Sequence, residues 1–339
     1  MIDRATAAAD PSPSHVRDEH SRQTRPDPRV SIVVPLFNEE QTLTALLARV
    51  LPVLEELGGG PHELVLVNDG SVDRTWDMLR AAASDNERIV AVSLSRNFGH
   101  QAALTAGIDE ATGDVVVVMD GDLQDDPDMV LHFVELFKQG YDVVYARRVR
   151  RKEPWWLKLS YRVFYRLITR IADVPLPTDA GDFGLMSRNV VRAMQRAPER
   201  NRYLRGLRAW AGFRQVGVPV ERFRRFSGRS KYGIWKLTRL AMDGIFAFSV
   251  VPIRLAAIVG ATAVAGAGLF GAYALYARVI LGQSPQGFTA LALLVILMSG
   301  FNLLFLGLIG EYVGRVYHEV KQRPVYVVDE IVGRRPSGT

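Results

Sequence analysis

The residues best suited to chemistry form a short acidic turn, in which Asp120 and Asp122 follow the apolar run Val115 to Met119. Two carboxylates spaced in this way can approach the same Mg²⁺ or Mn²⁺, either directly or through water. Such a cation keeps further coordination positions for the phosphate oxygens of a nucleotide. We therefore predict a divalent cation and a nucleotide at this turn. A plain solvated turn that caps the next helix explains Asp125 and Asp126, which stand just before a proline.

Two more polar clusters follow apolar runs and precede helical patterns. Asn68 and Asp69 stand in a strand-to-helix turn, and we predict that they contact the base or ribose together with the loop from Pro35 to Glu39. Arg96 ends another apolar run, where backbone N–H groups and a cation favour a bound anion. Three roles stay open for the nearby His100: a helix cap, a buried hydrogen-bonded side chain and a catalytic group.

Asp182 is a further candidate because it lies in a glycine-flanked segment after two prolines, which predicts irregular backbone. We predict that its carboxylate contacts the donor sugar or the acceptor, with a role as a catalytic base as one option. A phosphate acceptor needs little help in losing a proton, because its second pKa is about 6. A turn or a helix cap is the alternative.

These clusters can act together only if a folded domain brings them close in space, and the pattern of residues 29 to 225 predicts such a domain. Strands separated by helices form a parallel, doubly wound α/β sheet, similar to a Rossmann sheet. Ligands of such sheets bind beyond the carboxyl ends of the strands, so the polar clusters should face one crevice. Four apolar runs alternate with helical patterns in this range: Val30 to Pro35, Glu63 to Val67, Ile89 to Leu94 and Asp114 to Met119.

The composition limits the chemistry further. The chain has 339 residues, no cysteine, and a net charge of +6 from 42 basic and 36 acidic side chains. Without cysteine there is no disulfide, thiolate metal site or thiol nucleophile, so a metal must be held by carboxylates or histidines. Residues 1 to 28 are rich in proline and polar residues and carry no apolar run of secretory length, which predicts a disordered tail.

Two apolar segments predict a membrane anchor between residues 251 and 313. No charged residue occurs between Arg254 and Arg278, and a second uncharged stretch covers Phe288 to Gly310. Each is long enough to cross a hydrocarbon core of about 30 Å. Two crossings leave both flanking segments on the same side of the membrane. Because basic residues are concentrated in these flanks, we predict that the sheet domain, the tail 314 to 339 and both termini lie in the cytoplasm, at the plasma (inner) membrane. Buried helices of a soluble protein are the alternative.

Basic and aromatic side chains crowd the region before the first apolar span. Trp155 to Ile171 and Tyr232 to Phe248 have the pattern of amphipathic helices at a membrane interface, and residues 226 to 250 form a juxtamembrane segment. The cations between them predict a site for a lipid phosphate, with generic attraction to anionic lipids as the alternative. No recognition motif for nucleic acid accompanies them. The residues assigned to the phosphate site are Arg225, Arg229, Ser230 and Lys231.

Several short motifs together resemble the family 2 glycosyltransferases. These are Val-Pro-Leu-Phe-Asn-Glu-Glu40, Val-Asn-Asp-Gly-Ser71, Leu-Ser-Arg-Asn-Phe-Gly-His-Gln101, Met-Asp-Gly-Asp-Leu-Gln124 and Ala-Gly-Asp-Phe183. Later motifs are similar to those of the polyprenyl-phosphate glycosyltransferases, of the bactoprenol glucosyltransferase and dolichol-phosphate mannose synthase type. They are Arg-Gly-Leu-Arg-Ala-Trp-Ala-Gly-Phe213, Ser-Gly-Arg-Ser-Lys-Tyr232, Phe-Ser-Val-Val-Pro252 and Gly-Glu-Tyr-Val-Gly314.

The resemblance implies a GT-A fold, a nucleotide-diphosphate sugar donor and Mg²⁺ or Mn²⁺. It implies inverting transfer of one sugar to a polyprenyl phosphate, with glucose from UDP-glucose as the leading donor, and a homo-oligomer with a tetramer as one candidate. Carried onto this chain, Asp122 is the main metal ligand, and Asp120 and Gln124 support the metal or the donor. Asp182 keeps a position to which the family often gives a catalytic role.

Two other functions compete with this interpretation. A processive polysaccharide synthase shares the metal turn but usually carries more membrane helices and a Gln-x-x-Arg-Trp motif, of which only Arg208-Ala-Trp210 is present. A non-catalytic membrane scaffold or lipid transporter would use the two spans and leave the carboxylates idle. The intact carboxylates therefore favour the single-sugar transferase.

Overall fold

The computed structural model describes residues 25–148, 180–197, 199, 202–220, 251–280 and 287–333. The core of this described chain is an eight-stranded sheet in the order β7-β5-β6-β4-β1-β2-β3-β8. Four neighbouring strands are parallel, as the alternating pattern predicts, so their carboxyl ends meet at one edge. They are β4 (Val115–Val118), β1 (Val30–Leu36), β2 (Glu63–Asn68) and β3 (Ile89–Leu94).

The remaining strands make the sheet mixed. They are β5 (Val143–Arg148), β6 (Ala180–Ser187), β7 (Gln215–Val220) and β8 (Val328–Val332). β6 runs antiparallel to β4 and β5, and β8 runs antiparallel to β3. The predicted irregular loop around Asp182 is therefore wrong from Ala180 onward, because this segment forms β6. Gly184 permits the close pairing, since a Cβ there would lie 2.5 Å from the Val144 carbonyl oxygen.

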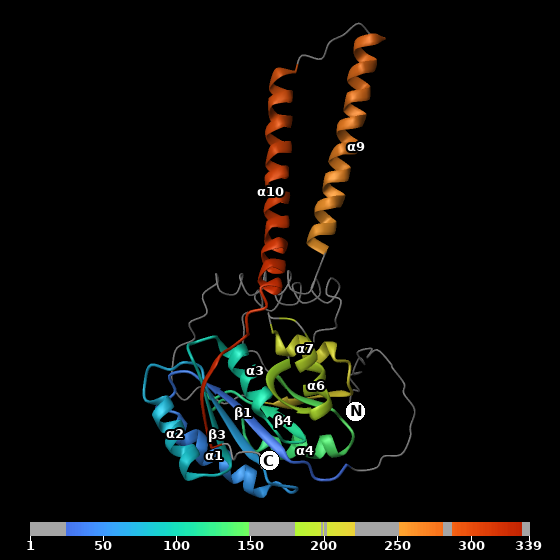
Figure 1. Cartoon of the computed structure of the whole chain (residues 1–339). Coiled ribbons are helices and arrows are strands. Elements are labelled where there is room, and N and C mark those ends of the chain that lie inside the picture. Colours follow the sequence, from blue (N-terminus) through green and yellow to red (C-terminus); the bar gives the residue numbers. More distant parts are fainter. Residues whose placement is uncertain are drawn as a thin grey trace, which may run out of the picture.

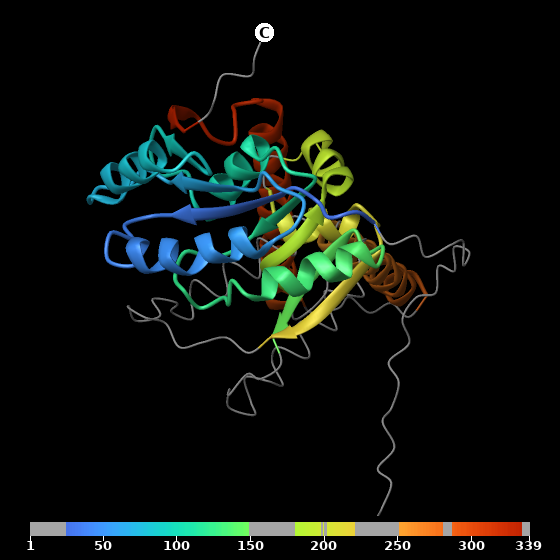
Figure 2. The ribbon, with the colours of Figure 1, turned by 90° about the horizontal axis from the view of Figure 1, so that it is seen from below.

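Helices cover both faces of the sheet. Alternate residues of a strand point to opposite faces, so Ile32 and Val34 of β1 join one apolar core and Val33 joins the other. Figure 2 shows α1 and α4 on one side of the sheet and α3 on the other. The first core contains residues of α1 (Leu43–Glu56), α2 (Thr75–Asp85) and α4 (Met129–Lys138); the second contains residues of α3 (His100–Glu110), α6 (Arg188–Arg196) and α7 (Leu204–Trp210).

Two long helices, α9 (Val251–Val279) and α10 (Phe288–Val320), extend away from the sheet domain (Figure 1). The windows Ala256–Tyr273 and Leu297–Gly314 are long and apolar enough to cross a membrane, and no part of either window is buried. The first window falls within the predicted span between Arg254 and Arg278, whereas the second window runs past the expected end of its span at Gly310, and α10 continues to Val320. Apolar surface of this extent indicates contact with a membrane or a partner.

The region after residue 314 differs from the tail that the sequence predicted. Its first part completes α10, and Val328–Val332 returns to the sheet as β8. A five-residue edge strand is too short for its alternation of apolar and polar residues to distinguish it from an unstructured tail. Its pairing with β3 is therefore seen only in the structure. Most of the predicted N-terminal tail and both predicted interfacial helices lie outside the described residues.

Candidate active site

The acidic turn after β4 is held in a defined shape by its own hydrogen bonds. The Asp122 carboxylate accepts the backbone N–H of Gln124 at 3.1 Å, and the buried Asp125 carboxylate accepts that of Asp120 at 3.4 Å. The N-cap position of α4 is occupied by Asp128, so neither Asp125 nor Asp126 caps the helix as predicted. Asp125 instead supports the turn from the interior.

This turn offers carboxylate and amide oxygens, the ligands that hard divalent cations prefer. The Asp120 side chain is 23% exposed and can therefore reach an ion from solvent. Within the part of the chain that the structure describes, no group of three or more His, Cys, Asp or Glu side chains is arranged to hold a metal ion by itself. A Mg²⁺ or Mn²⁺ shared with a nucleotide needs only one or two protein carboxylates, because phosphates and water complete the shell. The donor set at this turn fits such a shared site.

The turn after β2 is built by the side chains that the sequence assigned to nucleotide contact. The buried Asn68 accepts the Ser71 N–H at 3.0 Å and donates its amide to a serine of β3 at 3.1 Å. Asp69 accepts the N–H groups of Phe98 at 2.7 Å and Gly99 at 3.0 Å. Burial raises the pKa of Asp69, and these N–H groups oppose the rise. Asp69 therefore ties the end of β2 to the start of α3.

The other residues predicted for the donor pocket lie around the same edge or outside the described chain. Pro35 is buried within β1, and the Glu39 N–H in the following loop donates to Thr75 Oγ1 at 2.9 Å. Arg96 is exposed, and its guanidinium lies 3.9 Å from the centre of the Phe98 ring. The residues predicted to bind the lipid phosphate are not among those described: Arg225, Arg229, Ser230 and Lys231.

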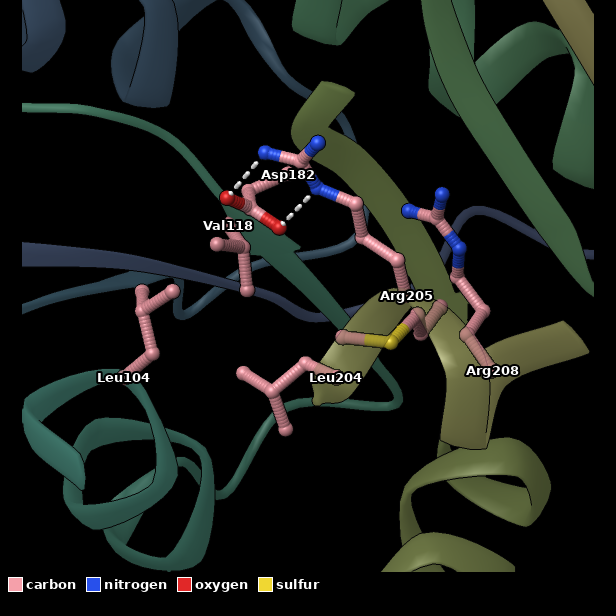
Figure 3. A pocket seen from close by; sticks show the side chains of 7 residues that line it. Leu104, Val118, Asp182, Leu204, Arg205 and Arg208 are labelled. Carbon is pink, nitrogen blue, oxygen red and sulfur yellow. Dashed lines mark hydrogen bonds and ion pairs between the residues drawn. The ribbon is translucent and has the colours of Figure 1, made fainter. Parts of the chain in front are cut away.

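The Asp182 carboxylate lies near the acidic turn, and His100 at the start of α3 lies close to both. The Nε2 atom of His100 lies 3.6 Å from Asp120 Oδ1 and 3.8 Å from Asp182 Oδ2. Asp182 also accepts two hydrogen bonds from Arg205, one from Nε at 2.6 Å and one from Nη2 at 2.7 Å (Figure 3). Side chains from β6, α3 and α7 thus converge with the acidic turn at one point.

Arg205 determines the charge of Asp182. The Asp182 side chain is only 9% exposed, and burial alone would raise its pKa. The guanidinium of Arg205 and the imidazole of His100 outweigh burial and hold the pKa of Asp182 well below its usual range. Asp182 is therefore a permanent carboxylate with both oxygens bound, an arrangement suited to orienting its neighbours.

Arg208 lies next to this ion pair, three residues along α7 from Arg205. Its side chain is buried, donates to the Gly181 carbonyl at 3.3 Å and sits 5.0 Å from the centre of the Tyr145 ring. Burial lowers the pKa of Arg208 to about 10. Asp182 and both arginines line a cavity of about 10 Å³, enough for one water molecule (Figure 3). Arg208 thus fixes α7 against β6 and sets the position of Arg205.

Arg205 and Arg208, the two arginines of α7, had no predicted role at the site. They were visible as Arg205-Gly-Leu-Arg208, whose spacing puts both side chains on one face of a helix. Nothing in that spacing reveals the carboxylate they face, because β6 reaches α7 only through the tertiary fold.

Gly70 keeps the turn after β2 close to the loop between β3 and α3. Its φ is +66°, and a Cβ there would collide with the backbone of Arg96 and Asn97. We expect Gly70→Ala to lower the free energy of unfolding by about 2 kcal/mol, because it strains the turn and displaces the loop. Thermal unfolding should be compared with Gly268→Ala, since a Cβ at Gly268 meets nothing within 4 Å. Equal Tm values for the two variants would contradict this role of Gly70.

Comparisons with known proteins agree with this architecture. A family model described as Glycosyl transferase family 2 matches residues 31–194. A Synechocystis glycosyltransferase described as uncharacterized is 42% identical over 305 residues, which are 90% of this chain and 96% of the relative. A prophage bactoprenol glucosyl transferase homolog of Escherichia coli is 36% identical over 304 residues, 89% of this chain and 99% of the relative.

Two further proteins extend these comparisons. An undecaprenyl-phosphate 4-deoxy-4-formamido-L-arabinose transferase of Serratia proteamaculans is 34% identical over 322 residues, 93% of this chain and 97% of the relative. A solved mannosyltransferase from Pyrobaculum calidifontis, in complex with GDP-Man and Mn2+, has a TM-score of 0.44 and 20% identity, covering 68% of this chain and 66% of that chain.

The mostly parallel α/β sheet with carboxylates at its strand ends, followed by two apolar helices, defines a GT-A type of architecture. The chain belongs to glycosyl transferase family 2 and is a glycosyltransferase. The resemblance drawn from the sequence motifs is thereby confirmed.

Proposed function

We propose that this enzyme transfers a single sugar from a nucleoside diphosphate sugar to a polyprenyl phosphate at a membrane surface. The observation that carries the proposal is the convergence of Asp120 and Asp182 on His100, in a chain with two uncovered apolar helices. The names of the similar proteins support the acceptor, because they include bactoprenol and undecaprenyl phosphate. Glucose from UDP-glucose is our leading donor.

Asp120 and Asp122, supported by Gln124, would hold Mg²⁺ or Mn²⁺ beside the diphosphate of the donor. When bound, such a cation neutralises the charge that develops on the departing nucleoside diphosphate. The turn is already shaped by the hydrogen bonds of Asp122 and Asp125, so its ligands need little reorganisation. Asn68, Asp69, Pro35, Glu39 and Arg96 complete the proposed donor side of the crevice.

We propose that the transfer is a direct displacement with inversion at the anomeric carbon. An oxygen of the acceptor phosphate attacks the anomeric carbon, and the bond from that carbon to the donor diphosphate breaks, so the nucleoside diphosphate leaves. The acceptor phosphate is largely dianionic at neutral pH because its second pKa is about 6, so the attack requires no separate proton acceptor. We assign Asp182 to orienting the reacting groups, since Arg205 fixes its carboxylate.

We place this reaction at the cytoplasmic face of the plasma (inner) membrane, in a homo-oligomer. α9 and α10 would cross the bilayer as a pair, and their basic flanks would keep the sheet domain and both termini cytoplasmic. The helices α3 and α7, which carry His100 and Arg205, lie on the side of the domain from which α9 and α10 extend (Figure 1). A polyprenyl phosphate headgroup would then lie within reach of the site.

The basic segment before α9 should act on the acceptor and leave the donor unaffected. We expect Arg229→Ala combined with Lys231→Ala to raise the KM for polyprenyl phosphate about tenfold, because two charge-assisted contacts to the phosphate are lost. The KM for the nucleotide sugar should stay within about twofold. Steady-state kinetics with each substrate varied in turn measures both values. An unchanged acceptor KM would show that these two residues do not bind the acceptor phosphate.

The proposed function is tested by incubating membranes that contain the protein with a panel of labelled nucleotide sugars. A lipid carrying one sugar is the expected product. A polymer would instead identify a processive synthase, and no product with any donor would favour a scaffold or transporter. Membranes with the Asp122→Ala protein provide the background.

A further inference from the structure

The segment after α10 is bound closely to the sheet domain. We call residues 326–333 the C-terminal strap. Its strand β8 pairs with β3 in the register Ala91 with Val332 through Leu94 with Val328. Only seven residues, 321–327, join the end of α10 to β8. Seven residues reach at most about 25 Å, so the strap limits how far the β3 edge can lie from the apolar helix.

The strap contacts the loop that leads to the candidate active site. The carbonyl of Val327 accepts the N–H of Ser95, the first residue after β3, at 2.9 Å. From Ser95 the chain continues to Phe98 and Gly99, whose N–H groups bind the Asp69 carboxylate. A continuous path of hydrogen bonds and backbone therefore runs from the strap to Asp69.

Tyr326 forms a second contact with the same region. Its hydroxyl donates to Asp109 Oδ2 on α3 at 2.8 Å, and its ring packs against the same apolar core as Phe98. Burial and Asp109 raise the pKa of Tyr326, so the hydroxyl stays protonated as a donor. The strap thus holds both the β3–α3 loop, through Val327, and the helix that follows it, through Tyr326.

We propose that the C-terminal strap is a positioning element for the donor side of the active site. It holds the β3–α3 loop, and through it Asp69, in a fixed place relative to α10. Tyr326 is its central positioning residue, because it alone among the described strap residues donates a side-chain hydrogen bond to α3. This inference rests on the proposed function in assigning Asp69 to the donor side.

A matched pair of variants in the full-length protein tests the strap. Tyr326→Ala removes the contact with α3, whereas Glu330→Gln removes only the exposed 2.6 Å ion pair with Arg80 on α2. Hydrogen exchange of the backbone amides of residues 95–99 measures how firmly the β3–α3 loop is held. Equilibrium binding of UDP in the presence of Mn²⁺ measures the affinity of the donor side of the site, and GDP replaces UDP if the wild-type protein binds GDP more tightly.

We expect Tyr326→Ala to speed exchange at residues 95–99 and to raise the nucleotide Kd and the donor KM about tenfold, with kcat changed by less than about threefold. Glu330→Gln should leave all of these within about twofold. Exchange and Kd equal to wild type in Tyr326→Ala would overturn the proposal. If Tyr326→Ala fails to fold, the milder variant Tyr326→Phe is used, and we expect it to change loop exchange and the nucleotide Kd about threefold. Values equal to wild type in Tyr326→Phe would then overturn the proposal. Absence of transfer by the wild type would defeat the proposed function instead, because loop exchange is measured without substrate.

Discussion

Asp122→Ala is expected to reduce sugar transfer about a thousandfold, equivalent to about 4 kcal/mol of transition-state stabilisation. Asp122 is the principal proposed ligand of the cation that balances the charge of the leaving nucleoside diphosphate. The expected loss lies mainly in kcat, since this charge develops as the bond breaks. The rate should be measured with purified protein at saturating donor, with Mg²⁺ and with Mn²⁺.

The matched control for Asp122→Ala is Asp126→Asn. Asp126 stands four residues further along, and its carboxylate pairs with Arg49 at 3.2 Å on the surface. An exposed ion pair contributes less than about 1 kcal/mol, so this variant should keep near-normal activity. Near-normal turnover of Asp122→Ala would remove the metal role from that residue, whereas equal losses in both variants would point to damage of the whole turn.

Arg205→Ala has the second largest expected effect, and it acts on both stability and activity. The substitution leaves the buried Asp182 carboxylate without its bidentate partner. Removing one partner of a buried ion pair costs about 3 kcal/mol, the lower end of the usual range, because Arg205 is itself 31% exposed. We expect a loss of this size in the free energy of unfolding and a fall in kcat of about a hundredfold.

A double-mutant cycle separates the ion pair from other effects of Arg205. Asp182→Asn and Arg205→Ala together should cost less than the sum of the single variants, because the unpaired charge is removed. With Arg205 present, the lowered pKa of Asp182 means that the stability it contributes is complete above the ordinary carboxyl pKa of about 4 and is lost as the pH falls below it, so the cycle should be measured near neutral pH. Additive single effects would contradict the pairing. Arg214→Ala, which removes an exposed cation over Tyr141, serves as the control.

The parallel half of the fold follows from local patterns in the sequence. Leu43, Leu46 and Val50 recur at helical spacing and are buried along α1. The apolar run before Asp120 forms β4, and the turn after it appears where the pattern places it. These elements are encoded by contiguous residues, so periodicity and turn chemistry identify them without tertiary information.

The antiparallel half and the completed site depend on contacts between distant residues. Asp182 was predicted on a loop because glycines flank it, but one of them, Gly184, permits β6 to pair closely with β5. Arg205 meets Asp182 across 23 residues of chain, and Tyr326 meets Asp109 across 217. No local spacing encodes such pairs, which form only when separate elements pack together.

Attack of an acceptor phosphate on the anomeric carbon of the bound sugar breaks the bond between that carbon and the donor diphosphate, and a double-labelled donor shows which bond breaks. The purified protein is incubated with polyprenyl phosphate and a nucleotide sugar that carries ³H in the sugar and ³²P in the phosphate attached to it. We expect ³H to enter the lipid while ³²P leaves with the nucleoside diphosphate. Entry of both labels into the lipid would mean transfer of a sugar phosphate and would contradict the mechanism.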